Sequence, residues 1–78
     1  VMNAGFSILA PHTHIRPHIG YSASMIRAHL GLVVPPQCGL RVENVTTTWT
    51  VGNWLVFDDT AEHEAWNNSD GNRAVLLV

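Results

Sequence analysis

The sequence predicts an all-β domain, a sandwich or a barrel of about eight short strands. Two observations lead to this fold class. Helix signals are scarce, because no window keeps apolar residues at sustained spacings of three and four. Short runs rich in β-branched and aromatic residues instead recur roughly every ten residues between Gly, Pro and Asn, which is typical of small all-β domains.

Each expected strand is a run of this kind with turn residues on both sides. In chain order, the strands are expected at 5–9, 14–18, 25–34, 39–42, 46–50, 54–58, 62–66 and 73–78. The turns between them are expected at Pro11, 20–24, 35–38, 43–44, 52–53, 59–61 and 67–72, where Gly, Pro, Asn, Asp and Ser gather. The 78 residues allow one domain, and no repeat, low-complexity tract or linker divides it.

Composition excludes several classes of partner. The net charge is −2, 13% of residues are charged and no basic run exists, which argues against a nucleic-acid-binding protein. The longest apolar stretches, 30–36 and 74–78, are too short to span a bilayer, and no stretch near the N-terminus resembles a signal peptide. Cys38 is the only cysteine and cannot form an internal bridge, so the expected location is cytoplasmic.

The two ends suggest a piece of a longer domain. The chain begins inside an apparently structured run and stops on the apolar residues 74–78, where a strand would normally be followed by a turn. We therefore expect a single core at 1–78, truncated at both ends; the alternative is that the last strand simply ends the protein. Apolar surface exposed by such truncation would favour a homodimer.

Side-chain alternation along a strand sorts the polar residues by face. His14, Arg16 and His18 are expected on one face of their strand. In the run 25–34, Arg27 and His29 share a face and the opposite face is aliphatic. In a sandwich this polar face is simply exposed to water, whereas in a small barrel it lines a ligand cavity. Both interpretations remain open at this point.

His18 and His63 are candidate metal ligands, since neutral imidazole is the commonest protein ligand of transition metals. Non-haem iron oxygenases usually add a carboxylate. That carboxylate commonly stands two residues after the first histidine, but here Gly20 occupies the position. Either water fills the site or another carboxylate substitutes, the candidates being Asp58, Asp59, Glu62 and Glu64.

Other interpretations use the same residues differently. His12, His14, His18 and His63 could form the four-histidine site of a simple metal-dependent cupin. A non-enzymatic cupin that binds metal or a small anion is a further alternative.

The three tryptophans Trp49, Trp54 and Trp66 are expected mostly to pack in the core or between strands.

Arg73 opens the last expected strand and is a candidate anion ligand. An arginine inside a barrel and beside a metal is suited to bidentate binding of a carboxylate. The alternative is a solvated turn arginine next to Asp70. Ser7, on the first strand, is able to add a hydrogen bond, although an ordinary strand serine is the default.

Several blocks resemble the aspartyl/asparaginyl β-hydroxylase family. The matching residues are Pro17–Gly20, Arg27–Pro35 and Phe57–Trp66, with Asn67 and Arg73 at the expected offsets. The resemblance covers nearly the whole chain. It implies a double-stranded β-helix, that is, a jelly-roll or cupin-like fold.

The resemblance also implies an Fe(II)- and 2-oxoglutarate-dependent dioxygenase with iron bound by only two histidines. These fall on His18 and His63, and Gly20 then matches the family, which lacks the usual carboxylate. Arg27 falls where the family places a basic residue facing the substrate carboxylate. Asp59 would orient an iron-bound water from outside the ligand set.

The cosubstrate residues follow by the same resemblance. Arg73 would hold the distal carboxylate of 2-oxoglutarate, Ser7 would add a hydrogen bond there, and His29 would contact the metal-proximal carboxylate. The implied reaction uses O₂ to hydroxylate an unactivated C–H bond. The implied substrate is the β-carbon of an Asp or Asn residue in a peptide or a related amino acid, with a lipid A acyl chain as the alternative.

Overall fold

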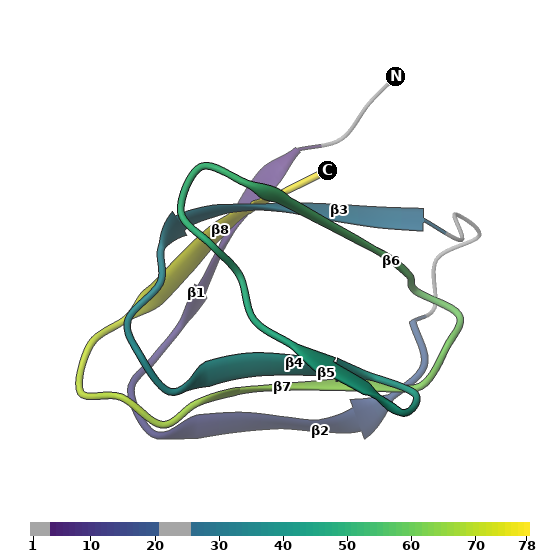
Figure 1. The fold of residues 1–78 in the computed structure, drawn as a ribbon, viewed down its shortest axis with the longest axis horizontal. Coiled ribbons are helices and arrows are strands. Elements are labelled where there is room, and N and C mark those ends of the chain that lie inside the picture. Colours follow the sequence, from purple (N-terminus) through teal and green to yellow (C-terminus); the bar gives the residue numbers. More distant parts are fainter. Residues whose placement is uncertain (1–3, 21–25) are drawn as a thin grey trace.

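The strands form two four-stranded sheets that face each other in the computed structural model, which describes residues 4–20 and 26–78 (Figure 1). The first sheet has the order β1-β8-β3-β6 and the second the order β2-β7-β4-β5. The strands are β1 (Gly5–Leu9), β2 (Thr13–His18), β3 (Ile26–Val33), β4 (Cys38–Val42), β5 (Val45–Thr47), β6 (Trp54–Asp58), β7 (His63–Asn67) and β8 (Arg73–Leu77).

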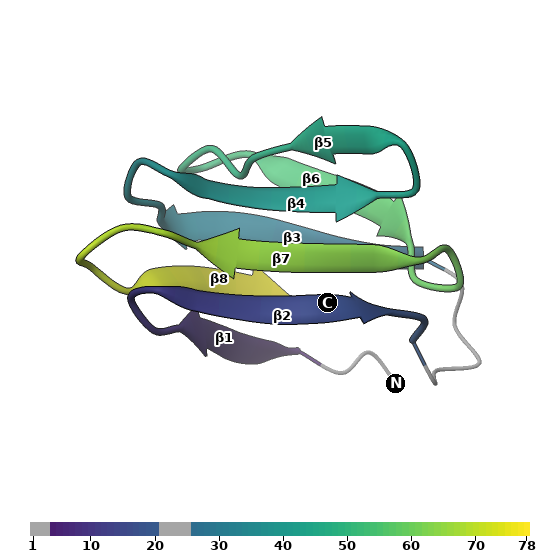
Figure 2. The same cartoon turned by 90° about the horizontal axis from the view of Figure 1, so that it is seen from below.

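The topology is that of a jelly roll. Neighbouring strands within each sheet pair antiparallel, and the chain changes sheet at every connection except the β4–β5 hairpin. Figure 2 shows the second sheet in front of the first, with β2, β7, β4 and β5 side by side. This arrangement confirms the predicted all-β, cupin-like fold class with eight strands.

Most predicted strands are present with bounds within one or two residues, but β5 differs. It ends at Thr47, whereas a strand through residue 50 was predicted. The physical reason is that residues 48–51 cross from the second sheet to the first, where Val51 forms an isolated bridge with Gly31. The predicted strand start at Met25 and most of the predicted turn at 20–24 lie outside the described residues.

The tight connections place non-glycine residues in the left-handed region. His12, Gln37 and Glu43 have φ values of 54°, 67° and 51°. Glycine adopts this region without strain, whereas other residues do so at a cost of about 1 kcal/mol.

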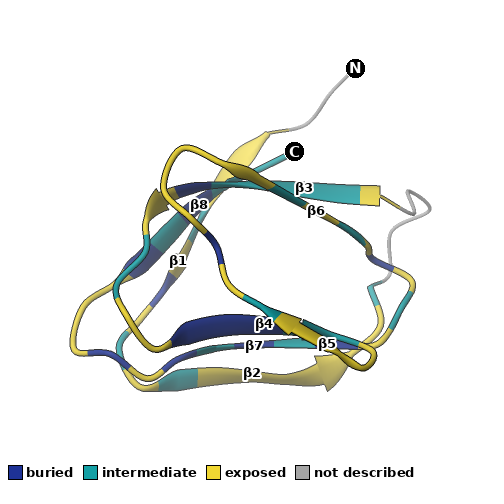
Figure 3. Cartoon of the chain, in the orientation of Figure 1, coloured by how far each residue is buried: buried dark blue, intermediate teal, exposed yellow. Residues whose placement is uncertain are grey.

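The core lies between the sheets, and Figure 3 shows buried residues in strands of both. Its buried apolar members are Leu9, Cys38, Leu40, Trp49, Ala65 and Val75. The outer face of the first sheet is also apolar but exposed: Phe6, Ile8, Trp54 and Val56 are each more than half accessible. Among the residues that the structure describes, no helix is long and apolar enough to cross a membrane.

Candidate functional site

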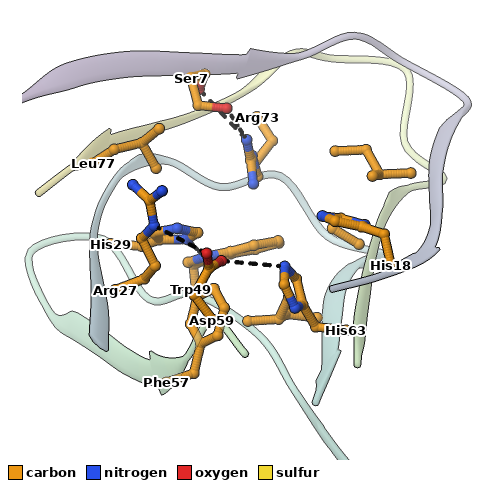
Figure 4. A pocket seen from close by; sticks show the side chains of 13 residues that line it. Ser7, His18, Arg27, His29, Trp49, Phe57, Asp59, His63, Arg73 and Leu77 are labelled. Atoms are coloured by element: carbon orange, nitrogen blue, oxygen red, sulfur yellow. Dashed lines mark hydrogen bonds and ion pairs between the residues drawn. The ribbon is translucent and has the colours of Figure 1, made fainter. Parts of the chain in front are cut away.

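A cavity of about 240 Å³ opens between the two sheets (Figure 4). The sequence-predicted site residues all line it, although they come from five strands and one turn: Ser7, His18, Arg27, His29, Asp59, His63 and Arg73. Apolar side chains, including Trp49, Phe57 and Leu77, complete the wall. The fold therefore brings every one of these candidates into a single space.

His18 and His63 face each other across the β2–β7 pair. They are partners in the strand register, and their ring centroids lie 4.3 Å apart. Nδ1 of His18 lies 2.9 Å from the carbonyl oxygen of Arg16, and Nδ1 of His63 lies 2.8 Å from that of Ala61. A carbonyl oxygen only accepts, so each Nδ1 carries the proton and donates it. In the neutral rings the two Nε2 atoms are then free to bind a metal, as in most protein histidine sites.

Asp59 is the carboxylate that accompanies this pair. It is buried in the turn after β6, and its Oδ1 lies 3.6 Å from Nε2 of His63. Its Oδ2 lies 3.5 Å from Nε of Arg27. A Cβ atom added to Gly20 would lie 1.8 Å from the same Oδ2, so the Asp59 carboxylate fills the space that a side chain at position 20 would need.

The other carboxylate candidates lie elsewhere. Asp58 accepts hydrogen bonds from the backbone and hydroxyl of Thr60, and Glu62 and Glu64 both bind the guanidinium of Arg41. In the described part of the chain, no three His, Cys, Asp or Glu side chains converge closely enough to hold a metal ion among themselves. The arrangement is thus two imidazoles with one carboxylate set back from them.

His12 and His14 do not reach the cavity, so the four-histidine interpretation is wrong. Nε2 of His12 lies 2.8 Å from Asp70 Oδ1, and Nε2 of His14 lies 2.7 Å from Glu64 Oε2. The prediction that His14 shares a face with His18 is also wrong. The β2–β7 register shifts between Ile15 and His18, and an irregularity of this kind breaks the alternation of faces.

Arg73 and Ser7 form a cationic group on the other side of the cavity. Arg73 is buried, and its Nη2 donates a hydrogen bond of 2.9 Å to Ser7 Oγ. Its Nε is buried without a hydrogen-bond partner among the described residues. Burial lowers the pKa of this guanidinium. The interpretation of Arg73 as a solvated residue next to Asp70 is therefore wrong, and an anion would satisfy the unpaired charge.

His29 lies beside this cationic group, on the inner face of β3. Burial lowers its pKa to about 4, and the nearby charges of Arg73 and Arg27 add to the effect. The imidazole is therefore neutral near pH 7. Nδ1 of the ring accepts a hydrogen bond of 3.2 Å from the indole nitrogen of Trp49.

Of the two interpretations of the polar face of β3, the cavity-lining one is confirmed. Arg27 and His29 both point between the sheets, and the side chain of Arg27 is 37% exposed at the opening. Trp49 and Phe57 are cavity-wall residues that were not predicted as such from the sequence, where Trp49 was expected only to pack in the core or between strands. Trp49 lies outside any strand, so alternation along a strand gave no signal for it.

Taken together, these groups can bind a divalent metal beside a small anion. The Nε2 atoms of two histidines and a carboxylate lie in one part of the cavity, and a buried guanidinium with a hydroxyl lies in the other. The donor set is therefore chemically suited to Fe(II) and a dicarboxylate, because imidazole binds iron and guanidinium binds carboxylate.

Known proteins resemble this chain over nearly its whole length. A family described as Aspartyl/Asparaginyl beta-hydroxylase matches residues 1–78. The chain is 43% identical over 74 residues to the aspartyl/asparaginyl beta-hydroxylase of Homo sapiens, which covers 94% of this chain and 10% of that protein. It is 45% identical over 78 residues to the ornithine lipid ester-linked acyl 2-hydroxylase of Rhizobium tropici, covering 96% and 28%.

A further relative is the aspartate beta-hydroxylase domain-containing protein 1 of Mus musculus, which is 38% identical over 79 residues. That match covers 97% of this chain and 22% of the relative. The chain thus spans between a tenth and little more than a quarter of the length of these relatives.

Proposed function

The chain belongs to the aspartyl/asparaginyl β-hydroxylase family, and we propose that it is the core of an Fe(II)- and 2-oxoglutarate-dependent dioxygenase. The observation that carries the proposal is the pair of imidazoles at His18 and His63. Each ring is anchored through Nδ1 to a carbonyl oxygen, so both Nε2 atoms are available in the cavity that also holds Arg73. A metal beside a buried cation that binds anions is what a 2-oxoglutarate enzyme requires.

In this proposal His18 and His63 hold Fe(II). Arg73 and Ser7 bind the distal carboxylate of 2-oxoglutarate, and His29 donates a hydrogen bond to the carboxylate near the metal. The bound iron and 2-oxoglutarate supply the oxidative chemistry, in which O₂ yields succinate, CO₂ and one hydroxyl group on a C–H bond of the substrate.

The protein contributes orientation, proton placement and a dry wall. The planar guanidinium of Arg73 fixes the distal carboxylate of the cosubstrate by bidentate hydrogen bonding. Phe57 and Leu77 form an apolar part of the cavity wall, which would keep water away from the reacting groups. Asp59 would accept a hydrogen bond from a water bound where Gly20 offers no side-chain ligand, since its carboxylate lies directly beside Gly20.

For the substrate we propose the β-carbon of an Asp or Asn residue, or of a related amino acid. Arg27 stands at the opening of the cavity, where a cation would attract an acidic substrate. A lipid acyl chain is the second candidate. The observation that favours it is the 45% identity to a relative named as an acyl 2-hydroxylase of an ornithine lipid.

The proposal is tested by loading the protein anaerobically with Fe(II) and 2-oxoglutarate. We expect the weak visible charge-transfer band of the iron chelate. His63→Ala should abolish the band, whereas His12→Ala, whose ring lies outside the cavity, should keep it. Absence of the band in iron-loaded wild-type protein would contradict the cosubstrate assignment and favour a cupin that only binds metal or an anion.

The substrate is tested separately with the same loaded protein. Asp- and Asn-containing peptides and an acylated ornithine lipid are each supplied with O₂. We expect succinate formation to accelerate with an acidic peptide and one oxygen atom to be added to that peptide. Acceleration by the lipid alone would contradict the amino-acid substrate and select the acyl alternative.

A further inference from the structure

Trp49 contacts two of the three cosubstrate candidates, His29 and Arg73, on the cavity wall. It is buried, with 3% of its surface accessible, in the segment that crosses from β5 toward β6. The edge of its indole faces His29, and the face of the same ring lies against Arg73 (Figure 4). One side chain outside the strands therefore connects residues of β3 and β8.

The contact with His29 determines which imidazole nitrogen carries the proton. The indole Nε1–H lies 3.2 Å from His29 Nδ1, and the two rings are inclined by only 16°. An indole nitrogen only donates, so Nδ1 must be the unprotonated atom. In the neutral imidazole the proton then resides on Nε2, which becomes a hydrogen-bond donor.

This tautomer matters because a neutral histidine recognises a carboxylate only through an N–H group. Burial, followed by the charges of Arg73 and Arg27, lowers the pKa of His29 to about 4, so a positive ring is not available near pH 7. A neutral ring with Nδ1–H would present a lone pair to the anion from Nε2. Fixing the proton on Nε2 avoids that repulsion.

The contact with Arg73 compensates part of the free-energy cost of burying the charge of that guanidinium. The guanidinium carbon lies 4.4 Å from the indole centroid, within the range of a cation–π interaction. The charge is buried, and its Nε has no hydrogen-bond partner among the described residues. The indole face stabilises this charge without using the Nη groups that would bind an anion.

We propose that Trp49 is a positioning residue that holds His29 as the Nε2–H tautomer and Arg73 in its anion-binding orientation, so that both bind 2-oxoglutarate. The inference rests on the proposed function for the identity of the anion. The tautomer itself is a property of the chain without metal or cosubstrate.

The first test needs neither iron nor 2-oxoglutarate. Long-range ¹H–¹⁵N correlation NMR of the wild-type protein at neutral pH reports which nitrogen of His29 is protonated. We expect protonation at Nε2 only. Protonation at Nδ1, or a charged ring, would overturn the proposal without bearing on the iron ligands, and no variant has to fold for this measurement.

The second test separates the effect of the indole N–H group, at the edge of the ring, from the effect of the aromatic face. Trp49→Phe removes the N–H but keeps an aromatic face, and Trp49→Leu removes both. Trp66→Phe is the matched control, because Trp66 packs on the outer face of the second sheet against Gly39. Denaturant unfolding of each variant reports the structural cost alone.

We expect Trp49→Phe to convert His29 into a mixture of tautomers and to weaken 2-oxoglutarate binding to Mn(II)-loaded protein about fivefold, as for one lost hydrogen bond. Trp49→Leu should weaken it further, and Trp66→Phe should leave it unchanged. A single Nε2–H tautomer and unchanged cosubstrate affinity in Trp49→Phe would overturn the inference. Failure of wild-type protein to bind 2-oxoglutarate would instead overturn the proposed function.

Discussion

Among single residues, a few cavity side chains have surroundings that favour ligand binding over packing. Arg73 is the clearest example, because it is buried, charged and bonded only to Ser7 among the contacts that the structure gives for its Nη groups. A buried cation with an unpaired donor is costly unless an anion joins it. The residue is thus better suited to binding a ligand than to stabilising the fold.

Arg73→Ala should weaken 2-oxoglutarate binding without removing the metal. Loss of a charge-assisted, two-pronged contact predicts a decrease in affinity of about tenfold to a hundredfold. Arg73→Lys should recover only part of it, since an ammonium lacks the planar fork. Calorimetric titration of Mn(II)-loaded protein measures the effect, with Arg41→Ala on the outer face as the control. Unchanged cosubstrate affinity would contradict the role assigned to Arg73.

Gly20→Ala should be destabilising because no space exists for a methyl group. The added Cβ would lie 1.8 Å from Asp59 Oδ2 and 2.3 Å from its Cγ, so the buried carboxylate would have to move. We expect a decrease in the free energy of unfolding of about 1–3 kcal/mol, the usual cost of overpacking. Denaturant titration measures it.

Gly71→Ala is the matched control for this substitution, because a Cβ there meets no atom within 4 Å. Adding Asp59→Ala to Gly20→Ala should restore part of the lost stability, since it removes the clashing group. Equal stability of Gly20→Ala and wild type would show that the Asp59 carboxylate does not fill this position.

At the scale of the element, the turn between β7 and β8 depends on one buried amide. Asn67 has no accessible surface, and its Nδ2 donates to the carbonyl oxygens of Leu9 and Gly71. Its Oδ1 accepts hydrogen bonds from Cys38 Sγ and from the backbone and hydroxyl of Ser69. The side chain therefore ties β1 and β4 to the turn that leads into Arg73.

Asn67→Ala should lower the free energy of unfolding by about 3 kcal/mol, because several buried groups lose their partners at once. Asn68→Ala serves as the control: Asn68 is exposed, and its backbone N–H makes the bond to Gln37 that the substitution keeps. Chemical denaturation of both variants measures the difference. A cost below about 1 kcal/mol would mean that water replaces the Asn67 amide at this site.

At the scale of the whole molecule, the two outer faces of the sandwich differ. The outer face of the second sheet carries a charged network in which Arg41 binds Glu62 and Glu64. The outer face of the first sheet carries an apolar row across all four strands. In register order this row is Phe6, Leu76, Leu30 and Trp54.

The homodimer expected from the sequence stays a prediction, and the apolar face is where it would form. Sedimentation at increasing concentration should show reversible association of the wild type, because an exposed apolar patch favours a partner. Phe6→Lys should shift the equilibrium toward monomer, whereas Thr46→Lys on the second sheet should not. A wild-type monomer at every concentration would contradict this expectation.

The pH dependence of stability should follow the buried imidazole of His29. Its folded-state pKa of about 4 lies below the ordinary 6.5, so the unfolded chain binds a proton more readily than the folded one. Its contribution is fully present above about 6.5 and is lost as the pH falls toward about 4. We expect a loss of about 2 kcal/mol, because partial solvent access reduces the full effect.

Denaturant unfolding across this interval measures the loss, and His29→Gln should remove most of the slope. Glu64, whose pKa is lowered by its hydrogen bond from Arg41, also loses its stabilising contribution as the pH falls, but only below the ordinary value of 4.5. A slope unchanged by His29→Gln would assign the pH dependence to other groups.

Local pattern predicted much of this architecture. Strand positions followed from β-branched runs between turn residues, and the aliphatic and polar faces of β3 followed from alternation, because both depend on near neighbours in the chain. Local pattern did not decide whether the polar face of β3 is exposed to water or lines a cavity, because this depends on where the second sheet lies.

The order of residues was enough to predict the all-β class, the family resemblance and the set of candidates from Ser7 to Arg73. The pairing of His18 with His63, with His14 facing outward, follows only from the packed strands, because the register shift in β2 leaves no signature in the order of residues. The packed structure alone placed Trp49 against His29 and Arg73, since a crossing segment has no periodicity that fixes its direction. Contacts between distant segments are set by how the sheets pack, which no local pattern specifies.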